Sequence, residues 1–269
     1  MINDCIIIEN LPSGGQKNVQ LAEHPTEGRV VIKRGAIKSF TSLERIKREV
    51  ELLSELKSEY YPQQHHFNID VKTKEFEIVE SYIEGKTLRD SMAEFKEPRK
   101  IFKLLDSLIK GLSIIWDKNI VHRDLKPENI IIRPSGLPCV IDLGIARFLD
   151  LEALTKTISP IGPCTPIYAA PEQLNNNKNL IDPRTDFFAL GIISLELFLG
   201  VHPFDPNIVG NHYSIVENIL QNKYVLETEF VNNNNSISEL SNKTLKTQPY
   251  QRFRNYQMLI DFVSQQEQL

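Results

Sequence analysis

The sequence predicts an α+β protein of two lobes, a strand-rich first third followed by a helical remainder, with a cleft between them. Short apolar runs separated by turn-forming residues fill the first third. Apolar residues at helical spacing dominate the rest. The chain has 269 residues, which suits one large domain or two tightly joined lobes.

The strands of the first third are expected in four places. Cys5–Ile8 is apolar and β-branched, and the runs 19–21 and 29–33 flank the turn-rich stretch 24–28. The run 75–80 alternates Glu-Phe-Glu-Ile-Val-Glu, which is typical of a strand with one buried face.

One helix is expected in the first third. Thr41 and Glu44 have the spacing of a capping box, so the helix begins near Ser42. Glu49 falls in the middle of its apolar face, whose other members are Ile46, Val50, Leu53 and Leu56. Either this carboxylate meets a buried cation, or it reaches water at the edge of the apolar stripe.

Three longer helices are expected in the remainder. Apolar residues recur with a helical period over 100–116, and 186–199 is a second, strongly apolar segment. The third is 256–265. The Asn-rich stretches 175–179 and 232–235 are predicted to be exposed loops.

Composition excludes several classes of protein. With 31 basic and 35 acidic residues the net charge is -4, which argues against a nucleic-acid binder. Cys5, Cys139 and Cys164 are too scattered for a disulfide framework or a zinc site. The start lacks the basic region of a secretory signal, and the apolar stretch 189–201 contains Glu196 and is too short to span a bilayer. We therefore expect a cytoplasmic protein that binds neither nucleic acid nor membrane.

The stretch His122-Arg123-Asp124-Leu125-Lys126-Pro127-Glu128-Asn129 carries the clearest chemistry. Two apolar strands, 130–132 and 139–141, follow it as a hairpin, and Asp142 comes directly after. Asn129 and Asp142 flank the hairpin and can face each other, which makes a hard-oxygen site suited to Mg²⁺. Asp124 could accept a proton beside that site, and Lys126 could neutralise charge on a moving phosphoryl group.

These residues resemble the catalytic loop of eukaryotic-type Ser/Thr protein kinases, with Asp142-Leu143-Gly144 standing where the family usually has Asp-Phe-Gly. The resemblance implies a single kinase domain over 1–269, with an N-lobe at 1–82, a C-lobe at 83–269 and a nucleotide cleft between them. It implies that ATP and Mg²⁺ are the cofactors and that protein serines and threonines are the substrates. Asp124 would be the catalytic base, and Asn129 and Asp142 the metal ligands.

The resemblance also assigns residues in the N-lobe. Val30-Val31-Ile32-Lys33 is similar to the strand that carries the ATP-anchoring lysine, and Glu49 would then be the partner of Lys33. Val19 and Val31 would cover the adenine ring, and Ile131 would form its floor.

The glycine-rich loop departs from the family pattern. Gly14 stands at the middle glycine of G-x-G-x-x-G, whereas Pro12 and Lys17 replace the other two. Either Gly14 and Gly15 suffice for the approach of the phosphates, or nucleotide affinity is low.

The linker between the lobes leaves one position open. Aligned on Glu84-Gly85, Ser81 and Ile83 supply the backbone groups that bind adenine, and Glu80 takes the usually apolar gatekeeper position. A shift of one residue would put Val79 there instead.

The segment Thr165-Pro166-Ile167-Tyr168-Ala169-Ala170-Pro171-Glu172 resembles the end of a kinase activation segment. The resemblance implies that Thr165 contacts the catalytic loop, that Glu172 pairs with Arg252, and that Asp186 supports the catalytic-loop backbone. Arg123 would pair with a phosphorylated residue of the activation segment, for which the candidates are Thr155, Thr157 and Ser159.

An active Ser/Thr protein kinase, with autophosphorylation in the activation segment, is the leading interpretation. One alternative is a pseudokinase, a nucleotide-binding scaffold with weak or no turnover, which the degenerate glycine loop favours. The other is a small-molecule phosphotransferase, against which the segment 165–172 argues. The length matches a bare kinase core, so control is expected from the activation segment, the glycine loop or a separate regulatory partner.

Overall fold

The structure is a computed structural model that describes residues 4–11, 18–36, 54, 56–70, 72–143, 164–225 and 235–267. The chain divides into two compact units, 1–84 with 144–158, and 85–143 with 159–269. The division after Glu84 lies near the predicted lobe boundary at residue 82, which stays a prediction.

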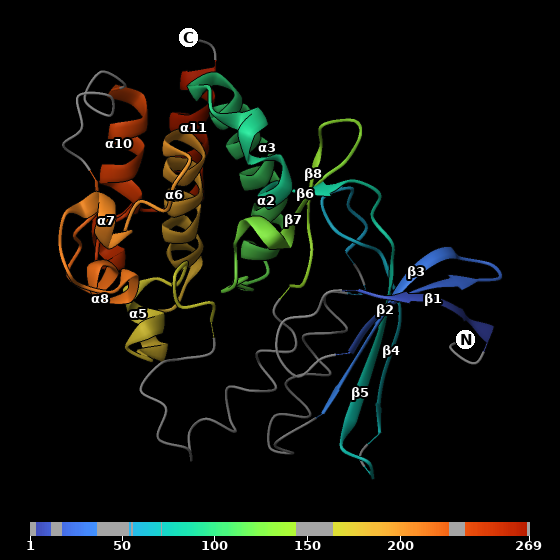
Figure 1. The fold of residues 1–269 in the computed structure, drawn as a ribbon. Coiled ribbons are helices and arrows are strands. Elements are labelled where there is room, and N and C mark those ends of the chain that lie inside the picture. Colours follow the sequence, from blue (N-terminus) through green and yellow to red (C-terminus); the bar gives the residue numbers. More distant parts are fainter. Residues whose placement is uncertain are drawn as a thin grey trace. The chain divides into compact units, whose positions relative to one another are not determined.

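The described part of the first unit is a five-stranded antiparallel sheet with strand order β1-β2-β3-β5-β4 (Figure 1). Its strands are β1 Ile6–Asn10, β2 Asn18–His24, β3 Gly28–Ala36, β4 Gln64–Asp70 and β5 Glu75–Ser81.

Strands β1, β2, β3 and β5 confirm the runs that the sequence predicts. Strand β4 was not predicted, because Gln-His-His-Phe-Asn-Ile-Asp lacks the apolar alternation of a half-buried strand. It lies at an edge of the sheet, where polar side chains are tolerated, since only one of its sides pairs with another strand.

The register of the sheet separates two faces. Successive residues of a strand point to opposite faces, and directly paired residues share a face. Val30 and Ile32 of β3 therefore point with Ala22 and Val79 into a buried cluster. Lys33 of β3 points to the opposite face.

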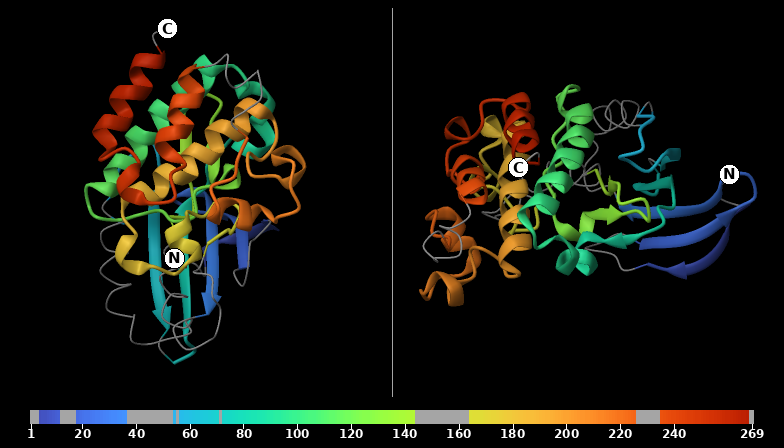
Figure 2. Two further views of the ribbon diagram at one scale, coloured as in Figure 1. Left: turned by 90° about the vertical axis from the view of Figure 1, so that its left-hand side faces the viewer. Right: turned by 90° about the horizontal axis from the view of Figure 1, so that it is seen from above.

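The second unit is built on long helices, seen from two further sides in Figure 2. Helix α6 (Pro183–Leu199) contacts α3 (Pro98–Trp116) and α10 (Asn235–Thr244), and α11 (Tyr256–Glu267) contacts α3. The three predicted long helices are thereby confirmed as α3, α6 and α11. Helix α10 was not predicted. It begins at Asn235, the last residue of the stretch 232–235, so the loop prediction is wrong at that residue.

Helix α6 is the buried centre of this unit. Asp182 caps its first turn by accepting the backbone N–H of Arg184 at 2.9 Å, and Pro183 occupies the first helical position. Gly200 ends the helix with a φ of 75°, a conformation that glycine adopts without strain. This helix carries Asp186 and Glu196 into the interior.

Shorter elements complete the described part of the second unit. A three-stranded sheet of order β6-β7-β8 contains Lys86–Thr87, Ile130–Ile132 and Pro138–Val140, which confirms the predicted hairpin. The short helices are α2 Leu88–Ser91, η2 Met92–Phe95, η3 Pro127–Asn129, α5 Pro171–Leu174, η4 Lys178–Leu180, α7 Pro206–Val209, α8 Ile215–Leu220 and η5 Pro249–Gln251.

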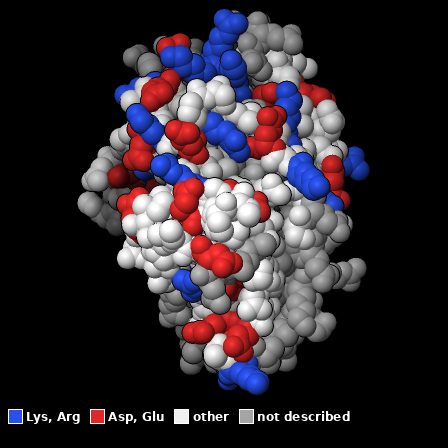
Figure 3. All heavy atoms as spheres, turned by 90° about the vertical axis from the view of Figure 1, so that its right-hand side faces the viewer, with Lys and Arg blue, Asp and Glu red and all other residues white. Residues whose placement is uncertain are grey.

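Charged side chains of both signs are interspersed over the face drawn in Figure 3. Within the ranges that the structure describes, no helix has both the length and the apolar character that a bilayer crossing needs.

Candidate active site

The carboxylate of Asp186 accepts hydrogen bonds from the backbone of the predicted catalytic loop. Its Oδ2 accepts hydrogen bonds from the indole of Trp116 at 2.8 Å and from the backbone N–H of His122 at 2.9 Å. Its Oδ1 accepts the N–H of Arg123 at 3.0 Å. Burial raises the pKa of Asp186 above its usual range, and the positive potential of His122 and these N–H donors oppose that rise. The predicted supporting role of Asp186 is confirmed.

Two backbone positions of the loop region adopt positive φ without being glycine. Arg123, directly before Asp124, has a φ of 66°, and Asp142 has a φ of 59°. Such conformations cost about 1–3 kcal/mol each and persist where the surroundings impose them. At Arg123 the surroundings are Asp186 on the N–H and the side-chain amide of Gln173, which donates to the Arg123 carbonyl at 2.8 Å.

Asp124 is buried, with 7% of its surface exposed, and Thr165 fixes one side of its carboxylate. Its Oδ1 accepts the Thr165 hydroxyl at 2.7 Å and the Thr165 backbone N–H at 3.1 Å. Lys126 Nζ donates to the same hydroxyl oxygen at 3.0 Å and lies 3.7 Å from Asp124 Oδ2. The structure thus brings Asp124, Lys126 and Thr165 together, as the sequence predicts.

The side chain of Asn129 is oriented by Asp124. Its Nδ2 donates to the Asp124 carbonyl at 2.8 Å and to Asp124 Oδ2 at 3.4 Å. An amide that uses its nitrogen on one side presents its oxygen on the other. The Asn129 carbonyl also accepts the N–H of Ile141 at 2.9 Å, which brings the chain before Asp142 beside Asn129. An amide oxygen and a carboxylate next to each other fit the hard-oxygen ligands that Mg²⁺ prefers.

In the first unit, Lys33 forms a buried ion pair with Glu80. Lys33 Nζ lies 2.7 Å from Glu80 Oε2, and the two side chains are only 10% and 15% exposed. Glu80 is directly opposite Val31 and so shares the face of Lys33, whereas Val79 points into the buried cluster on the other face. Of the two gatekeeper candidates, Glu80 is therefore the one that shares a face with Lys33.

Other residues predicted to bind nucleotide lie on the face of Lys33, at the end of β5 and, in the case of Ile131, in the second unit. Val19 pairs directly with Lys33 across β2 and β3, so Val19, Val31 and Lys33 share one face. The backbone N–H of Ser81 donates to the Gln63 carbonyl at 2.8 Å. Ile83 follows after β5, in the first unit, and Ile131 lies half-buried on β7 of the second unit.

Several predicted residues lie outside the part of the chain that the structure describes. They are Gly14, Glu49, Thr155, Thr157 and Ser159.

The predicted pair of Glu172 and Arg252 is confirmed. The guanidinium donates to both carboxylate oxygens, at 2.7 and 2.8 Å, and the side chains are 1% and 0% exposed. Thr185 adds a third donor to the carboxylate at 2.9 Å, and the Arg252 Nε donates to the Lys246 carbonyl at 2.8 Å. This bidentate pair ties the end of the activation segment to the C-terminal part of the unit.

A further buried network was not predicted. Glu196 accepts hydrogen bonds from Arg89 Nη1 at 2.9 Å and from the Tyr168 hydroxyl at 2.5 Å, and Arg89 also bonds to Tyr168 and to Glu128. Burial and the neighbouring Glu196 raise the pKa of Tyr168. The available signal was Glu196 itself, a carboxylate within the apolar stretch 189–201, which needs a buried partner.

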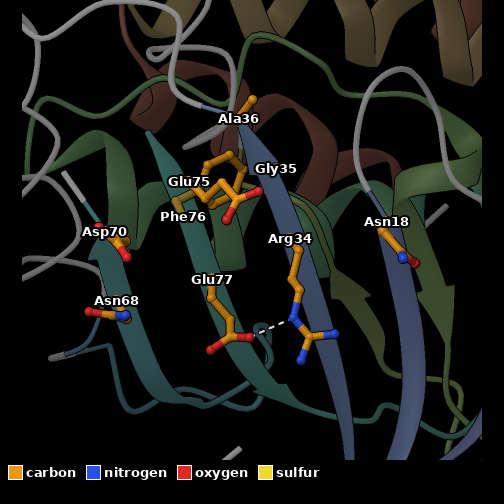
Figure 4. Close-up of a pocket in the computed structure, with 9 residues that line it drawn as sticks. All are labelled: Asn18, Arg34, Gly35, Ala36, Asn68, Asp70, Glu75, Phe76 and Glu77. Carbon is orange, nitrogen blue, oxygen red and sulfur yellow. Dashed lines mark hydrogen bonds and ion pairs between the residues drawn. The ribbon is translucent and has the colours of Figure 1, made fainter. Parts of the chain in front are cut away.

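A pocket of about 580 Å³ opens at one end of the five-stranded sheet (Figure 4). Arg34 and Glu77 line it and form an ion pair at 2.6 Å on the face opposite Lys33. None of the site residues named from the sequence is among the described residues that line this pocket.

Comparison with known proteins identifies the family of the chain. The model of the protein kinase domain family matches residues 7–261. The chain is 33% identical over 222 residues to the serine/threonine-protein kinase pkn2 of Myxococcus xanthus, which covers 77% of the chain and 26% of pkn2. It is 29% identical over 205 residues to PrkC of Bacillus subtilis, covering 74% of the chain and 31% of PrkC.

The probable serine/threonine-protein kinase PkwA of Thermomonospora curvata is 30% identical over 211 residues, with 76% of the chain and 27% of PkwA covered. The chain thus spans about a quarter to a third of the length of these relatives. The catalytic-loop geometry and the family match over nearly the whole chain lead to one conclusion: the chain belongs to the protein kinase family, whose members are ATP-dependent phosphotransferases.

Proposed function

We propose that the chain is an active serine/threonine protein kinase domain that transfers the γ-phosphoryl group of ATP to serine or threonine hydroxyls of protein substrates. The observation that carries the proposal is the buried Asp124, whose carboxylate is held by Thr165 and lies beside Lys126 and Asn129. Such a carboxylate can orient a hydroxyl and accept its proton, while the neighbouring cation offsets negative charge.

The second unit supplies the groups for the transfer step. Asp124 is the catalytic base, and Lys126 stabilises charge on the moving phosphoryl group. Asn129 and Asp142 are proposed to hold Mg²⁺, which when bound neutralises charge on the phosphates. The support for these ligands is the side-chain orientation of Asn129, whose nitrogen is engaged by Asp124.

The first unit supplies the groups for nucleotide binding. Lys33 is proposed to bind the phosphates, Gly14 the phosphate-facing loop, and Val19 and Val31 the adenine. Ser81 and Ile83 are proposed to contact adenine through the backbone. Ile131, which belongs to the second unit, is proposed to form the floor beneath the ring. The Lys33–Glu80 pair resembles the buried lysine–glutamate pair that active protein kinases require. Glu49 is proposed as the glutamate partner of Lys33 that the family resemblance implies.

The test is phosphoryl transfer from labelled ATP with Mg²⁺, with the chain alone and with a generic protein substrate. Asp124→Asn is expected to lower transfer by about 10²–10⁴-fold, the usual contribution of a general base. Asp261→Asn, at an exposed position of α11, is the matched control and is expected to leave transfer unchanged.

The site of the label distinguishes the alternatives. Label on Thr155, Thr157 or Ser159 would identify autophosphorylation in the activation segment. Nucleotide binding without transfer under several metal conditions would contradict the proposal and indicate a pseudokinase. Transfer only to small molecules would indicate a small-molecule phosphotransferase instead of a protein kinase.

A further inference from the structure

Glu27, His65 and Ser81 form a hydrogen-bonded line in the first unit. His65 Nε2 lies 2.7 Å from the hydroxyl oxygen of Ser81, and His65 Nδ1 lies 3.1 Å from Glu27 Oε2. A hydroxyl, an imidazole and a carboxylate in this order are the arrangement that activates a serine for nucleophilic attack.

Three different elements bring these residues together. Glu27 lies in the turn between β2 and β3, and Ser81 is the last residue of β5. In β4 the register shifts between Gln64 and His66, so His65 is the extra residue of a bulge. A bulge re-aims a side chain relative to its neighbours, and here the re-aimed imidazole contacts both Glu27 and Ser81.

The carboxylate of the line is itself fixed. Glu27 Oε1 accepts the hydroxyl of Thr26 at 3.1 Å, and the Glu27 backbone N–H donates to His24 Nδ1 at 3.2 Å. An ionised carboxylate only accepts hydrogen bonds, so His65 Nδ1 carries the proton that faces Glu27. In the neutral imidazole the other nitrogen is then an acceptor, and the Ser81 hydroxyl donates to His65 Nε2.

We propose that Ser81 is a nucleophilic site that is acylated by activated acyl esters. The bond that forms joins Ser81 Oγ to the acyl carbon, and the bond that breaks joins that carbon to the leaving oxygen. The hydroxyl proton passes to His65 Nε2 and then to the leaving group. His65 is the base, and Glu27 is a positioning residue that acts through His65.

The backbone around Ser81 limits this chemistry to a single modification. The N–H of Ser81 donates to the Gln63 carbonyl at 2.8 Å, and the N–H of Tyr82 donates to the Arg29 carbonyl at 3.0 Å. Both neighbouring N–H groups are therefore engaged and do not stabilise the oxyanion that forms in acylation and in deacylation. An ester with a good leaving group can still acylate Ser81, whereas the alkyl ester that forms has a poor leaving group, so acylation without rapid deacylation is the expected result.

The experiment is a burst assay with p-nitrophenyl acetate. The wild-type chain is expected to release about one p-nitrophenolate per chain with little further turnover, since acyl-enzyme accumulation gives a burst. Peptide mass spectrometry is expected to place the acetyl group on Ser81. Ser81→Ala should abolish the burst, and His65→Gln should slow it by roughly 100-fold, the lower range for loss of a general base.

Glu27→Gln tests the positioning role. It is expected to slow the burst by about tenfold, the effect of weakening one charge-assisted hydrogen bond, without changing the modified residue. Ser135→Ala in an exposed turn and His66→Gln next to His65 are matched controls that should leave the burst unchanged. Thermal melting of every variant distinguishes loss of the nucleophile from loss of the fold.

Two results would overturn the proposal: an acetyl group found on residues other than Ser81, or a burst of equal rate in the His65→Gln variant.

Discussion

Lys33 Nζ lies 2.7 Å from Glu80 Oε2, and both residues belong to neighbouring strands of one sheet. The backbone ladder between β3 and β5 therefore fixes the separation of the ammonium and the carboxylate. A buried ammonium without a counter-charge is costly, so a carboxylate on the adjacent strand stabilises the charged form of Lys33. In this chain the sheet itself contributes a partner for the lysine that is proposed to bind ATP phosphates.

The first prediction concerns Glu80. Glu80→Gln keeps the size of the side chain but removes its charge, so Lys33 loses a hydrogen bond to a charged group. Such bonds contribute about 1.5–3 kcal/mol, which corresponds to roughly 10- to 100-fold in rate or affinity. We expect kcat/KM for ATP to fall by at least about tenfold.

Glu77→Gln is the control for this variant. Glu77 is also on β5 and also forms an ion pair, with Arg34 at 2.6 Å, but on the opposite face of the sheet. Its ATP kinetics should match those of the wild type. Unaltered ATP kinetics in Glu80→Gln would show that the pair with Lys33 has no part in nucleotide binding.

The second prediction concerns Thr165. Its hydroxyl donates to Asp124 Oδ1 at 2.7 Å and accepts from Lys126 at 3.0 Å. Thr165→Val removes both bonds with little change in volume, so Asp124 loses orientation and kcat should fall roughly 10- to 100-fold, with a smaller change in KM for ATP. Thr165→Ser retains the hydroxyl and should restore most of kcat in the same steady-state assay. A Thr165→Val variant with wild-type kcat would refute this role.

The third prediction concerns the stability of the second unit. Arg252→Met leaves the carboxylate of Glu172 buried without its cation, and breaking a buried pair costs about 3–5 kcal/mol. Denaturant unfolding should show this loss. Glu239→Gln breaks the exposed pair with Lys243, whose side chains are 51% and 48% exposed, and should change stability by less than about 1 kcal/mol. Similar losses in the two variants would contradict the difference that burial makes.

The fourth prediction concerns pH and His202. Burial lowers the pKa of His202 below 6.5, with Glu196 opposing the shift. Its Nε2 donates to the Ile167 carbonyl at 2.9 Å, and its Nδ1 accepts the N–H of Phe204 at 3.3 Å, so the folded state holds the neutral ring. The unfolded chain binds the proton at a higher pH than the folded chain does. Stability is therefore fully present above about pH 6.5 and is lost as the pH falls from there through the folded pKa.

Urea unfolding between pH 7.5 and 5 measures this loss. His202→Gln can still donate to Ile167 but does not titrate, so its stability should depend less on pH over that window. His212→Gln, at an exposed position, should keep the wild-type dependence. An equally steep dependence in His202→Gln would assign the effect to other groups.

Much of the site of the second unit could be predicted from sequence. Asp124, Lys126 and Asn129 lie within one short loop, so local chain geometry already brings them close together. The hairpin between Asn129 and Asp142 returns the chain to the same place, as the bond from Ile141 to Asn129 shows. The proximity of these residues could be predicted because they are close in the sequence or are connected by a single hairpin.

The partners that come from distant elements were harder to predict. The sequence did not decide whether Glu80 or Val79 takes the gatekeeper position, because that depends on which face of β5 each side chain occupies. Arg89 and Glu196 are far apart in the chain, and their contact depends on how α2 and α6 pack. Strand β4 was not predicted because its mostly polar residues do not alternate with apolar ones, which is the pattern that indicates a strand.

By itself the sequence determined the fold class, the long helices, most strands of the first sheet and the loop that carries Asp124. It could do so because helical and strand periods and a contiguous motif are local properties of the chain. Tertiary structure decided the face on which Glu80 meets Lys33, the buried network around Glu196 and the line from Glu27 through His65 to Ser81. These depend on register, on a bulge and on helix packing, and each arises only when residues distant in the chain are brought within hydrogen-bonding distance.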